Sequence, residues 1–234
     1  AHFGIESRIP NKKICFVNDD QSPSKKIVKL PYPKLIRLKR KSPKFLLYNC
    51  YAPEYYPCRY GISNNAYLLN RSYQDLKFLE KYLDKNIYSK FYISNKYSDN
   101  DKSIKKVNQF IKKKKVIKNI AFRKQLDNAK LVICTHPQTT FLESIASGPT
   151  IGLFNYKDWL PTKDNLEIYK KFRENNIFFE DAKELANFIN RKWDFIDLWW
   201  EGLKQKKLID QYIELFQKDT DYLKDWKNFL RKIV

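Results

Sequence analysis

A histidine, a glutamine, two threonines and a glutamate lie close together where an apolar run gives way to a helical pattern. The run LVICT (131–135) is typical of a buried parallel strand, and QTTFLESIAS (138–147) has helical spacing. The first N–H groups of a helix have no partner within it, and the helix dipole attracts anions there. The pattern therefore predicts a phosphate site at the helix start and, one helical turn further in, a side chain that accepts hydrogen bonds from ribose hydroxyls. The residues concerned are His136, Gln138, Thr139, Thr140 and Glu143.

A purely structural interpretation of the same stretch stays open. In it Thr139 caps the helix and His136 is an ordinary residue of the turn made with Pro137. The two interpretations differ in what occupies the start of the helix, and the rest of the chain is needed to choose between them.

Strands and helices alternate along most of the chain, which predicts a doubly wound α/β fold with a parallel sheet. Ser72 and Asp181 are expected to cap their helices. Ligands of such folds bind beyond the carboxyl ends of the strands, so the loops after Tyr51, Ser94, Thr135 and Asn155 are expected at the functional edge. Strands are expected at 13–17, 44–52, 91–94, 116–120, 131–135, 150–154 and 177–179. Helices are expected at 72–85, 101–114, 123–129, 138–147, 166–175 and 181–191.

Three parts are expected along the chain. Residues 1–43 form an N-terminal or interdomain segment with one strand, 44–192 a Rossmann-like domain, and 193–234 aromatic-rich helices that pack back on it. The tryptophans of this last part have two interpretations. They are core side chains, or they attach the protein to a membrane interface or a lipid-linked acceptor. These residues are Trp193, Trp199, Trp200 and Trp226.

The net charge of +20 invites a nucleic-acid function, but lysines far outnumber arginines and are spread along the chain. This distribution favours a solvated surface and a general attraction to anions over a specific nucleic-acid site. No apolar run approaches the roughly 20 residues of a membrane span. The four cysteines have no CxxC spacing, which fits a reducing, cytoplasmic setting.

Several chemistries are excluded by missing motifs. The chain has no GxGxxG fingerprint, no GxxxxGK[ST] loop and no GxSxG elbow. Two histidines cannot form a multi-histidine metal site. Asp99-Asn100-Asp101 resembles a DxD metal motif, but Asp101 precedes a predicted helix and capping explains it more simply. No metal and no other cofactor is expected.

The order of strand, polar turn, TTFLE helix, Gly-Pro and apolar strand resembles the nucleotide-binding C-terminal half of GT-B glycosyltransferases. PTIGLFN resembles the next strand of that half, and YKKFRENNIFFEDAKELANFI its late helix-strand-helix unit. The tail WDFIDLWWEGLKQKKLIDQYIELF is similar to the ending of bacterial surface-carbohydrate transferases, including those proposed for Kdo-like and nonulosonic acid sugars. HFGI and LLNRSYQD resemble their interdomain His-Gly segment and their arginine-bearing loop.

The resemblance implies roles for individual residues. His136, Thr139 and Thr140 would contact the donor phosphate, with Gln138 beside them, and Glu143 the ribose or base. Arg71 would neutralise the departing phosphate, although a surface arginine without a role is an open alternative. His2 would face the cleft, unless it belongs to a frayed terminus. The pair His136-Pro137 makes a CMP-activated acidic sugar attractive as the donor.

The resemblance also implies a function and its partners. The chain is expected to be a metal-independent glycosyltransferase, or its donor-binding half, acting on a surface polysaccharide or glycolipid. Its partners would be a nucleotide-sugar, a glycan or lipid-linked acceptor, and an N-terminal acceptor domain that this chain lacks. The expected location is cytoplasmic, with peripheral contact at the inner face of the membrane. A basic nucleic-acid-binding module and a non-catalytic nucleotide-sugar-binding subunit are the alternatives.

Overall fold

The computed structural model describes most of the chain. The described residues are 13–15, 27–29, 40–49, 65–94, 116–117, 120–159, 163–216 and 222–233. The helix expected at 101–114, the acidic pair Asp99 and Asp101, and His2 lie outside them.

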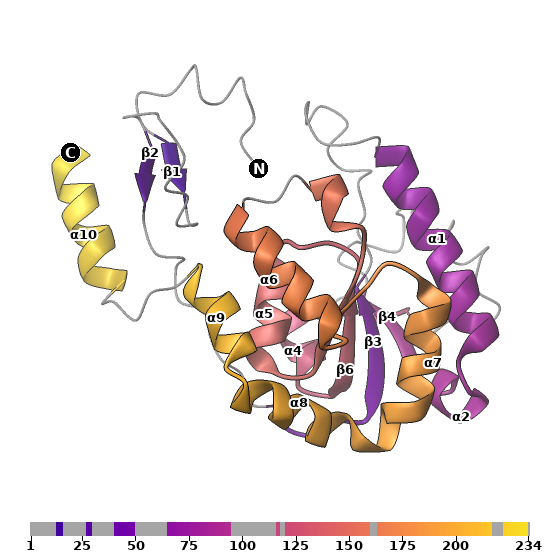
Figure 1. Cartoon of the computed structure of the whole chain (residues 1–234). Coiled ribbons are helices and arrows are strands. Elements are labelled where there is room, and N and C mark those ends of the chain that lie inside the picture. The colour runs from indigo at the N-terminus through magenta and orange to yellow at the C-terminus, as the bar shows by residue number, and fades with distance from the viewer. Residues whose placement is uncertain are drawn as a thin grey trace.

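A six-stranded, entirely parallel sheet forms the centre of the molecule (Figure 1). Its order is β5-β4-β3-β6-β7-β8, so the first strand of this sheet lies in the middle and the chain winds outward in both directions. This is the strand order of the Rossmann fold, and the predicted fold class is confirmed. The strands are β3 (Phe45–Asn49), β4 (Phe91–Ser94), β5 (Val116–Ile117), β6 (Ala129–Cys134), β7 (Thr150–Leu153) and β8 (Phe178–Phe179).

A separate two-stranded parallel sheet joins β1 (Lys13–Cys15) to β2 (Ile27–Lys29). The strand expected at 13–17 is thus present at 13–15, and 16–17 lie outside the described residues. The second strand was not expected from the sequence.

In the described part of the chain, helices lie between β3 and β4, β5 and β6, β6 and β7, and β7 and β8, as parallel strands require. They are α1 (Asn65–Tyr82) and α2 (Lys85–Tyr88), then α4 (Phe122–Leu126), α5 (Thr139–Ser147) and α6 (Lys163–Glu174), with the 3₁₀ turn η2 (Tyr156–Trp159) after β7. The helix α7 (Ala182–Lys192) follows β8. The cap at Asp181 is confirmed, because its carboxylate accepts the N–H of Glu184 at 2.8 Å. The cap at Ser72 is wrong, since α1 begins seven residues earlier and Ser72 is buried inside it.

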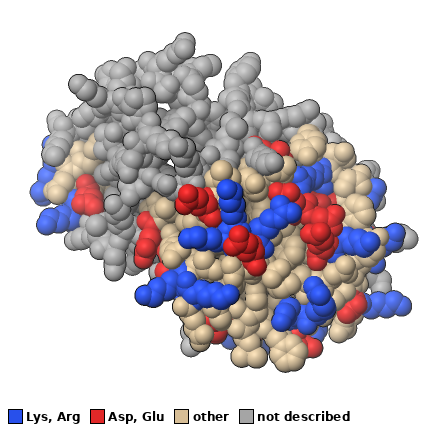
Figure 2. Space-filling model, viewed as in Figure 1, with Lys and Arg blue, Asp and Glu red and all other residues tan. Residues whose placement is uncertain are grey.

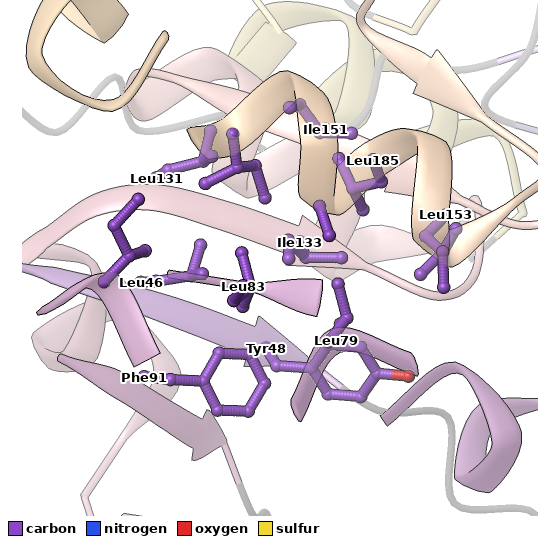
Figure 3. Packing of buried hydrophobic residues seen from close by; sticks show 14 of the residues in the cluster. Leu46, Tyr48, Leu79, Leu83, Phe91, Leu131, Ile133, Ile151, Leu153 and Leu185 are labelled. Atoms are coloured by element: carbon purple, nitrogen blue, oxygen red, sulfur yellow. The ribbon is translucent and has the colours of Figure 1, made fainter. Parts of the chain in front are cut away.

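Both faces of the sheet are covered by helices, and each carries its own apolar layer. Side chains alternate between the faces along every strand, so neighbouring residues of one strand enter different layers. On one face Leu46, Tyr48 and Ile133 pack under α1 and α7, as Figure 3 shows. On the other, Leu47 and Val132 pack under α5, α6 and α9. This double covering explains why the strands read as continuous apolar runs.

The C-terminal helices cross from one face of the sheet to the other beneath its amino edge (Figure 1). Trp193 and Ile196 belong to the first apolar layer, whereas Trp200 and Leu203 belong to the second. Trp199 packs against both. The core interpretation of this aromatic band is therefore confirmed for these three tryptophans. The elements are η3 (Trp193–Phe195), α8 (Ile196–Gln205), α9 (Leu208–Glu214) and α10 (Tyr222–Ile233).

The end of α5 is fixed by Gly148 and by an arginine from the segment before β3. Gly148 has φ +152°, and a Cβ built on it would lie 2.7 Å from Arg40 Nε. Glycine is thus needed here both for its backbone conformation and for the close approach of the guanidinium. Arg40 donates to the carbonyls of Ala129 and Pro149, both at 3.0 Å.

Candidate functional site

The carboxyl ends of β3 and β6 lie side by side at the point where the sheet reverses its winding direction. Asn49, the last residue of β3, is in register with Cys134, the last of β6. Both the backbone N–H and the hydroxyl of Thr135 donate to the carbonyl of Asn49, at 3.2 and 3.3 Å. Ligands of open α/β sheets bind in the crevice formed at this switch point. The sequence-predicted turn after β6 is therefore in the expected place.

A chain of hydrogen bonds links three side chains at this point. Asn49 Nδ2 donates to Thr140 Oγ1 at 2.9 Å, and Thr140 Oγ1 lies 3.1 Å from His136 Nε2. The three residues come from β3, the turn and the first turn of α5. The arrangement fixes the threonine hydroxyl and the imidazole relative to the start of the helix.

The imidazole of His136 is only 6% exposed, and burial lowers its pKa from 6.5 to about 4. The ring is therefore neutral at physiological pH. A neutral imidazole contacts an anion through one hydrogen bond and does not form an ion pair. The attraction of this site for an anion must come mainly from the helix dipole and the first backbone N–H groups of α5.

The side chains that reach solvent at this helix start are those of Gln138 and Thr139, with Thr140 half-buried. Gln138 is the N-cap residue and makes no capping hydrogen bond with its side chain. Thr139 is already the first helical residue, so its expected role as the cap in the structural interpretation is wrong. The helix start thus has two exposed polar side chains that its own capping does not use.

Glu143 faces α4 in this structure. Its carboxylate lies 2.9 Å from Arg123 Nη2, and the glutamate is the more buried partner. The carboxylate that the sequence pattern selects as an acceptor of ribose hydroxyls is therefore already paired with a cation on a neighbouring helix. A partly exposed pair of this kind contributes little to stability, so a competing ligand group would displace it at small cost.

Arg71 lies on α1, at the carboxyl side of β7 and β8. Its Nη2 donates to the carbonyl of Glu180 at 2.7 Å, and its Nη1 lies 3.6 Å from Asp158 Oδ2. These contacts hold α1 against the segments that follow β7 and β8. Arg71 thus belongs to the same edge of the sheet as His136, but it contacts Glu180 and Asp158 and not the Asn49–Thr140–His136 chain.

A buried carboxylate accompanies Arg71 one helical turn further on. Asp75 is 8% exposed, and its pKa is raised to about 7, mainly by burial. The charge of Arg71 opposes this shift, and that of Asp181 adds to it. Asp75 therefore keeps its proton to a much higher pH than an ordinary aspartate does. Perturbed carboxyl groups of this kind cluster at functional sites, although structural networks produce them as well.

The sequence pattern selects His136 and Thr140 as candidates, and the structure brings them together with Asn49, which the pattern does not select, as it does not select Asp75. Asn49 ends a strand that is adjacent to β6 only in the folded sheet, and the Rossmann strand order is the signal that points to it. Asp75 looks like an ordinary polar residue of an amphipathic helix, and no sequence pattern marks its burial. His2, expected in the cleft, lies outside the described residues.

Within the described ranges, no group of three or more His, Cys, Asp or Glu side chains is arranged to hold a metal ion. In the part of the chain that the structure describes, no helix is both long and apolar enough to cross a bilayer. Figure 2 shows Lys and Arg side chains mixed with Asp and Glu over the described part of the face in view. On that face the positive charge is not gathered into the stripe typical of nucleic-acid binding.

We expect His136→Gln to flatten the acid limb of the stability profile. In the unfolded chain a histidine binds its proton near pH 6.5, whereas His136 in the native state does so near pH 4. The native protein therefore loses stability as the pH falls from about 6.5 to about 4, by roughly 1 to 3 kcal/mol. Urea unfolding of both proteins at a series of pH values measures the difference. Curves that stay parallel from pH 7.5 to pH 4.5 would contradict the burial of the ring.

The model of the LIC12162 family transferases matches residues 18–230, which is most of the chain and includes every described element of the large sheet. No curated protein matches the chain. A match over this share of the chain identifies its family. The chain therefore belongs to the LIC12162 family of transferases.

Proposed function

We propose that the protein is a glycosyltransferase of the GT-B type, or its donor-binding half, and that the start of α5 receives the phosphate of a nucleotide-sugar. The observation that carries the proposal is the Asn49–Thr140–His136 hydrogen-bonded chain at the sheet's switch point. A transferase needs a site that holds an activated group. The start of α5 combines an oriented hydroxyl and an imidazole with the unpaired N–H groups of a helix start.

The donor phosphate would accept hydrogen bonds from the first N–H groups of α5 and from the hydroxyls of Thr139 and Thr140. In the tautomer with the proton on His136 Nε2, both His136 and Asn49 donate to Thr140 Oγ1, so the hydroxyl hydrogen is left for the phosphate and little reorganisation is needed when the ligand binds. Glu143 would accept ribose hydroxyls, exchanging its contact with Arg123. Such a site accelerates transfer by positioning the donor and stabilising the charge on the departing phosphate.

Arg71 would supply positive charge at the same edge of the sheet and so stabilise the phosphate as it departs. Its contacts with Glu180 and Asp158 hold it at the carboxyl side of β7 and β8, near the path of a sugar that extends from α5 across the sheet. We propose a metal-independent reaction, since helix start, hydroxyls and guanidinium supply the stabilisation. The donor proposed is a CMP-activated acidic sugar of the Kdo or nonulosonic acid type.

The acceptor would be a surface polysaccharide or a glycolipid. A GT-B enzyme binds its acceptor on a second domain, and this chain resembles the donor half alone. The acceptor domain, and with it a catalytic base, would be supplied by residues outside this sequence, on the same polypeptide or on a partner. The reaction would take place in the cytoplasm, at the inner face of the membrane where lipid-linked glycans are assembled.

A thermal-shift screen against CMP, UDP, GDP and ADP tests this function. A specific nucleotide at 100 times its Kd should add about 2.7 kcal/mol to the free energy of unfolding. We expect Thr140→Val to weaken binding at least tenfold, because it removes the hydroxyl and keeps the volume. At the same ligand concentration the stabilisation then falls to about half.

Thr140→Ser is the matched control, because it keeps the hydroxyl and is expected to bind within a few-fold of the parent. His136→Gln and Thr139→Val should each weaken binding as well. If Thr140→Val responds to the nucleotide as the parent does, the phosphate is bound elsewhere. If none of the four nucleotides stabilises the parent, the proposed donor site is wrong.

A further inference from the structure

A second cleft lies at the opposite, amino edge of the sheet. It has a volume of about 610 Å³, within the range of small-molecule sites. It is open on one side and is formed where β3, β4 and β6 begin and where η3 passes beneath them. The lining side chains that matter for its chemistry are Lys44, Phe45, Lys90, Tyr92, Lys130, Trp193 and Asp194.

This cleft is distinct from the proposed donor site. Lys130 stands near the start of β6 and His136 follows its end, and a strand advances about 3.3 Å per residue, so the two sites are roughly 17–20 Å apart. A ligand of the size of one nucleotide-sugar cannot occupy both. The amino-edge cleft is thus free for another molecule, or for a distant part of a long one.

The charges of the cleft favour an anion. The lining includes three lysines, Lys44, Lys90 and Lys130, and one acidic residue, Asp194. Lys44 and Lys90 are exposed. The ammonium group of Lys130 is 5.1 Å from the centre of the Trp193 ring, which holds it at the wall by a cation–π contact.

Aromatic rings form the remaining wall. Phe45 and Tyr92 contact each other with ring centroids 4.9 Å apart and are both only half-buried. Half-buried rings beside lysines suit a ligand with both apolar faces and negative charge. Sugar rings present C–H groups on their faces, and acidic sugars carry carboxylates at their edges. Asp194 can accept hydrogen bonds from sugar hydroxyls, which a site for phosphate alone would not need.

We propose that this cleft binds an acidic saccharide chain. The inference rests on the proposed function, because it identifies the bound saccharide with the acceptor or the product of the transfer. Binding at a second point keeps a polymer near the donor site between transfers and raises its effective concentration there. The choice of a saccharide over a nucleic acid follows from the lysine and carboxylate lining, since arginine is the residue favoured for nucleic acids.

Titration calorimetry with tetragalacturonate, an oligosaccharide with one carboxylate per sugar, tests the proposal. We expect saturable binding by the parent, and binding at least tenfold weaker in the double variant Lys44→Glu and Lys90→Glu. Both side chains are exposed, so the fold should be kept. The control is Lys170→Glu with Lys171→Glu, an equal change of charge at exposed positions of α6, which should bind within twofold of the parent.

Two further ligands identify what the cleft recognises. Neutral maltotetraose should bind at least tenfold more weakly than tetragalacturonate, and so should inorganic tripolyphosphate. Tyr92→Leu keeps an apolar side chain but removes the ring, and it should weaken tetragalacturonate binding at least threefold. The melting temperature of this variant is measured in parallel to check its fold. The proposal is overturned if the parent does not bind tetragalacturonate, if the cleft variant binds as the parent does, or if tripolyphosphate binds equally well.

The two proposals fail separately. In the Lys44→Glu and Lys90→Glu variant the nucleotide-induced thermal shift should equal that of the parent, because the donor site lies at the other edge. Loss of saccharide binding with an intact nucleotide shift supports the cleft. Loss of both would show that the substitutions disturb the whole domain, which would overturn the assignment of a separate site.

Discussion

Replacement of Arg40 by alanine is expected to lower the free energy of unfolding by about 3 to 4 kcal/mol. The guanidinium Nη1 donates to the carbonyls of Ala129, Lys130 and Pro149 at 3.0 to 3.2 Å, and Nη2 donates to Ser144 O and Thr150 Oγ1 at 3.3 Å. Truncation leaves a cavity and deprives several enclosed acceptors of a charged donor, at about 1 to 3 kcal/mol for each that stays unsatisfied. Urea unfolding with linear extrapolation measures the loss.

Two further variants separate hydrogen bonding from packing. Burial lowers the pKa of Arg40 to about 9, so the group still carries its charge at neutral pH. Arg40→Met restores most of the volume but no donor, and should recover only a minor share of the stability. Arg40→Lys keeps a charge but cannot reach acceptors on β6, α5 and β7 together, and should fall between alanine and the parent. A loss below 1 kcal/mol in the alanine variant would show that the carbonyls find other donors.

Arg40 also shows a limit of sequence reasoning. Its acceptors are mostly backbone carbonyls 89 to 109 positions away, and every residue has a carbonyl, so no pattern of residue types reveals the contact. The glycine at the end of α5 was visible as a helix stop. That it also makes room for a guanidinium could be seen only in the fold.

Local patterns predicted the elements well. FYIS is a strand with the predicted bounds, and Leu76, Leu79 and Leu83 are all buried as their helical spacing indicates. The start of α1 was misplaced because Ser72 looks like a cap. In the fold its carbonyl accepts the hydroxyl of Tyr48 from the neighbouring strand, so the residue lies in a packed helix interior.

The candidate site could be predicted only in part, because sequence patterns identify groups that local structure brings together. His136 and Thr140 are four residues apart, and the turn alone brings them together. Asn49 is 91 residues from Thr140 and meets it only because β3 and β6 pair. Spacing along the chain therefore identifies groups held by one turn, whereas groups from neighbouring strands need the strand order as well.

Replacement of Asp75 by asparagine is expected to make the protein more stable at alkaline pH and to leave it nearly unchanged at acid pH. Asp75 is enclosed between α1 and the start of α7, where burial raises its pKa to about 7, against the opposing effect of Arg71 and with a contribution from Asp181. An unfolded aspartate releases its proton near pH 3.9. Ionising Asp75 in the native state therefore costs free energy that asparagine avoids, on the order of 2 to 4 kcal/mol above pH 7.

The sign of this effect distinguishes Asp75 from His136. Between about pH 4 and pH 7 the native state holds the Asp75 proton and the unfolded state does not, so stability from this group is complete below pH 4 and is lost as the pH rises through 7. His136 acts in the opposite direction over pH 4 to 6.5. Subtracting the unfolding free energies of parent and Asp75→Asn at each pH cancels the histidine and isolates the carboxyl. The exposed Asp84→Asn serves as the matched control for the loss of one carboxyl group. A difference for Asp75→Asn that stays flat over this pH window would mean that its carboxylate is solvated or paired, and that the edge beside Arg71 holds no proton at neutral pH.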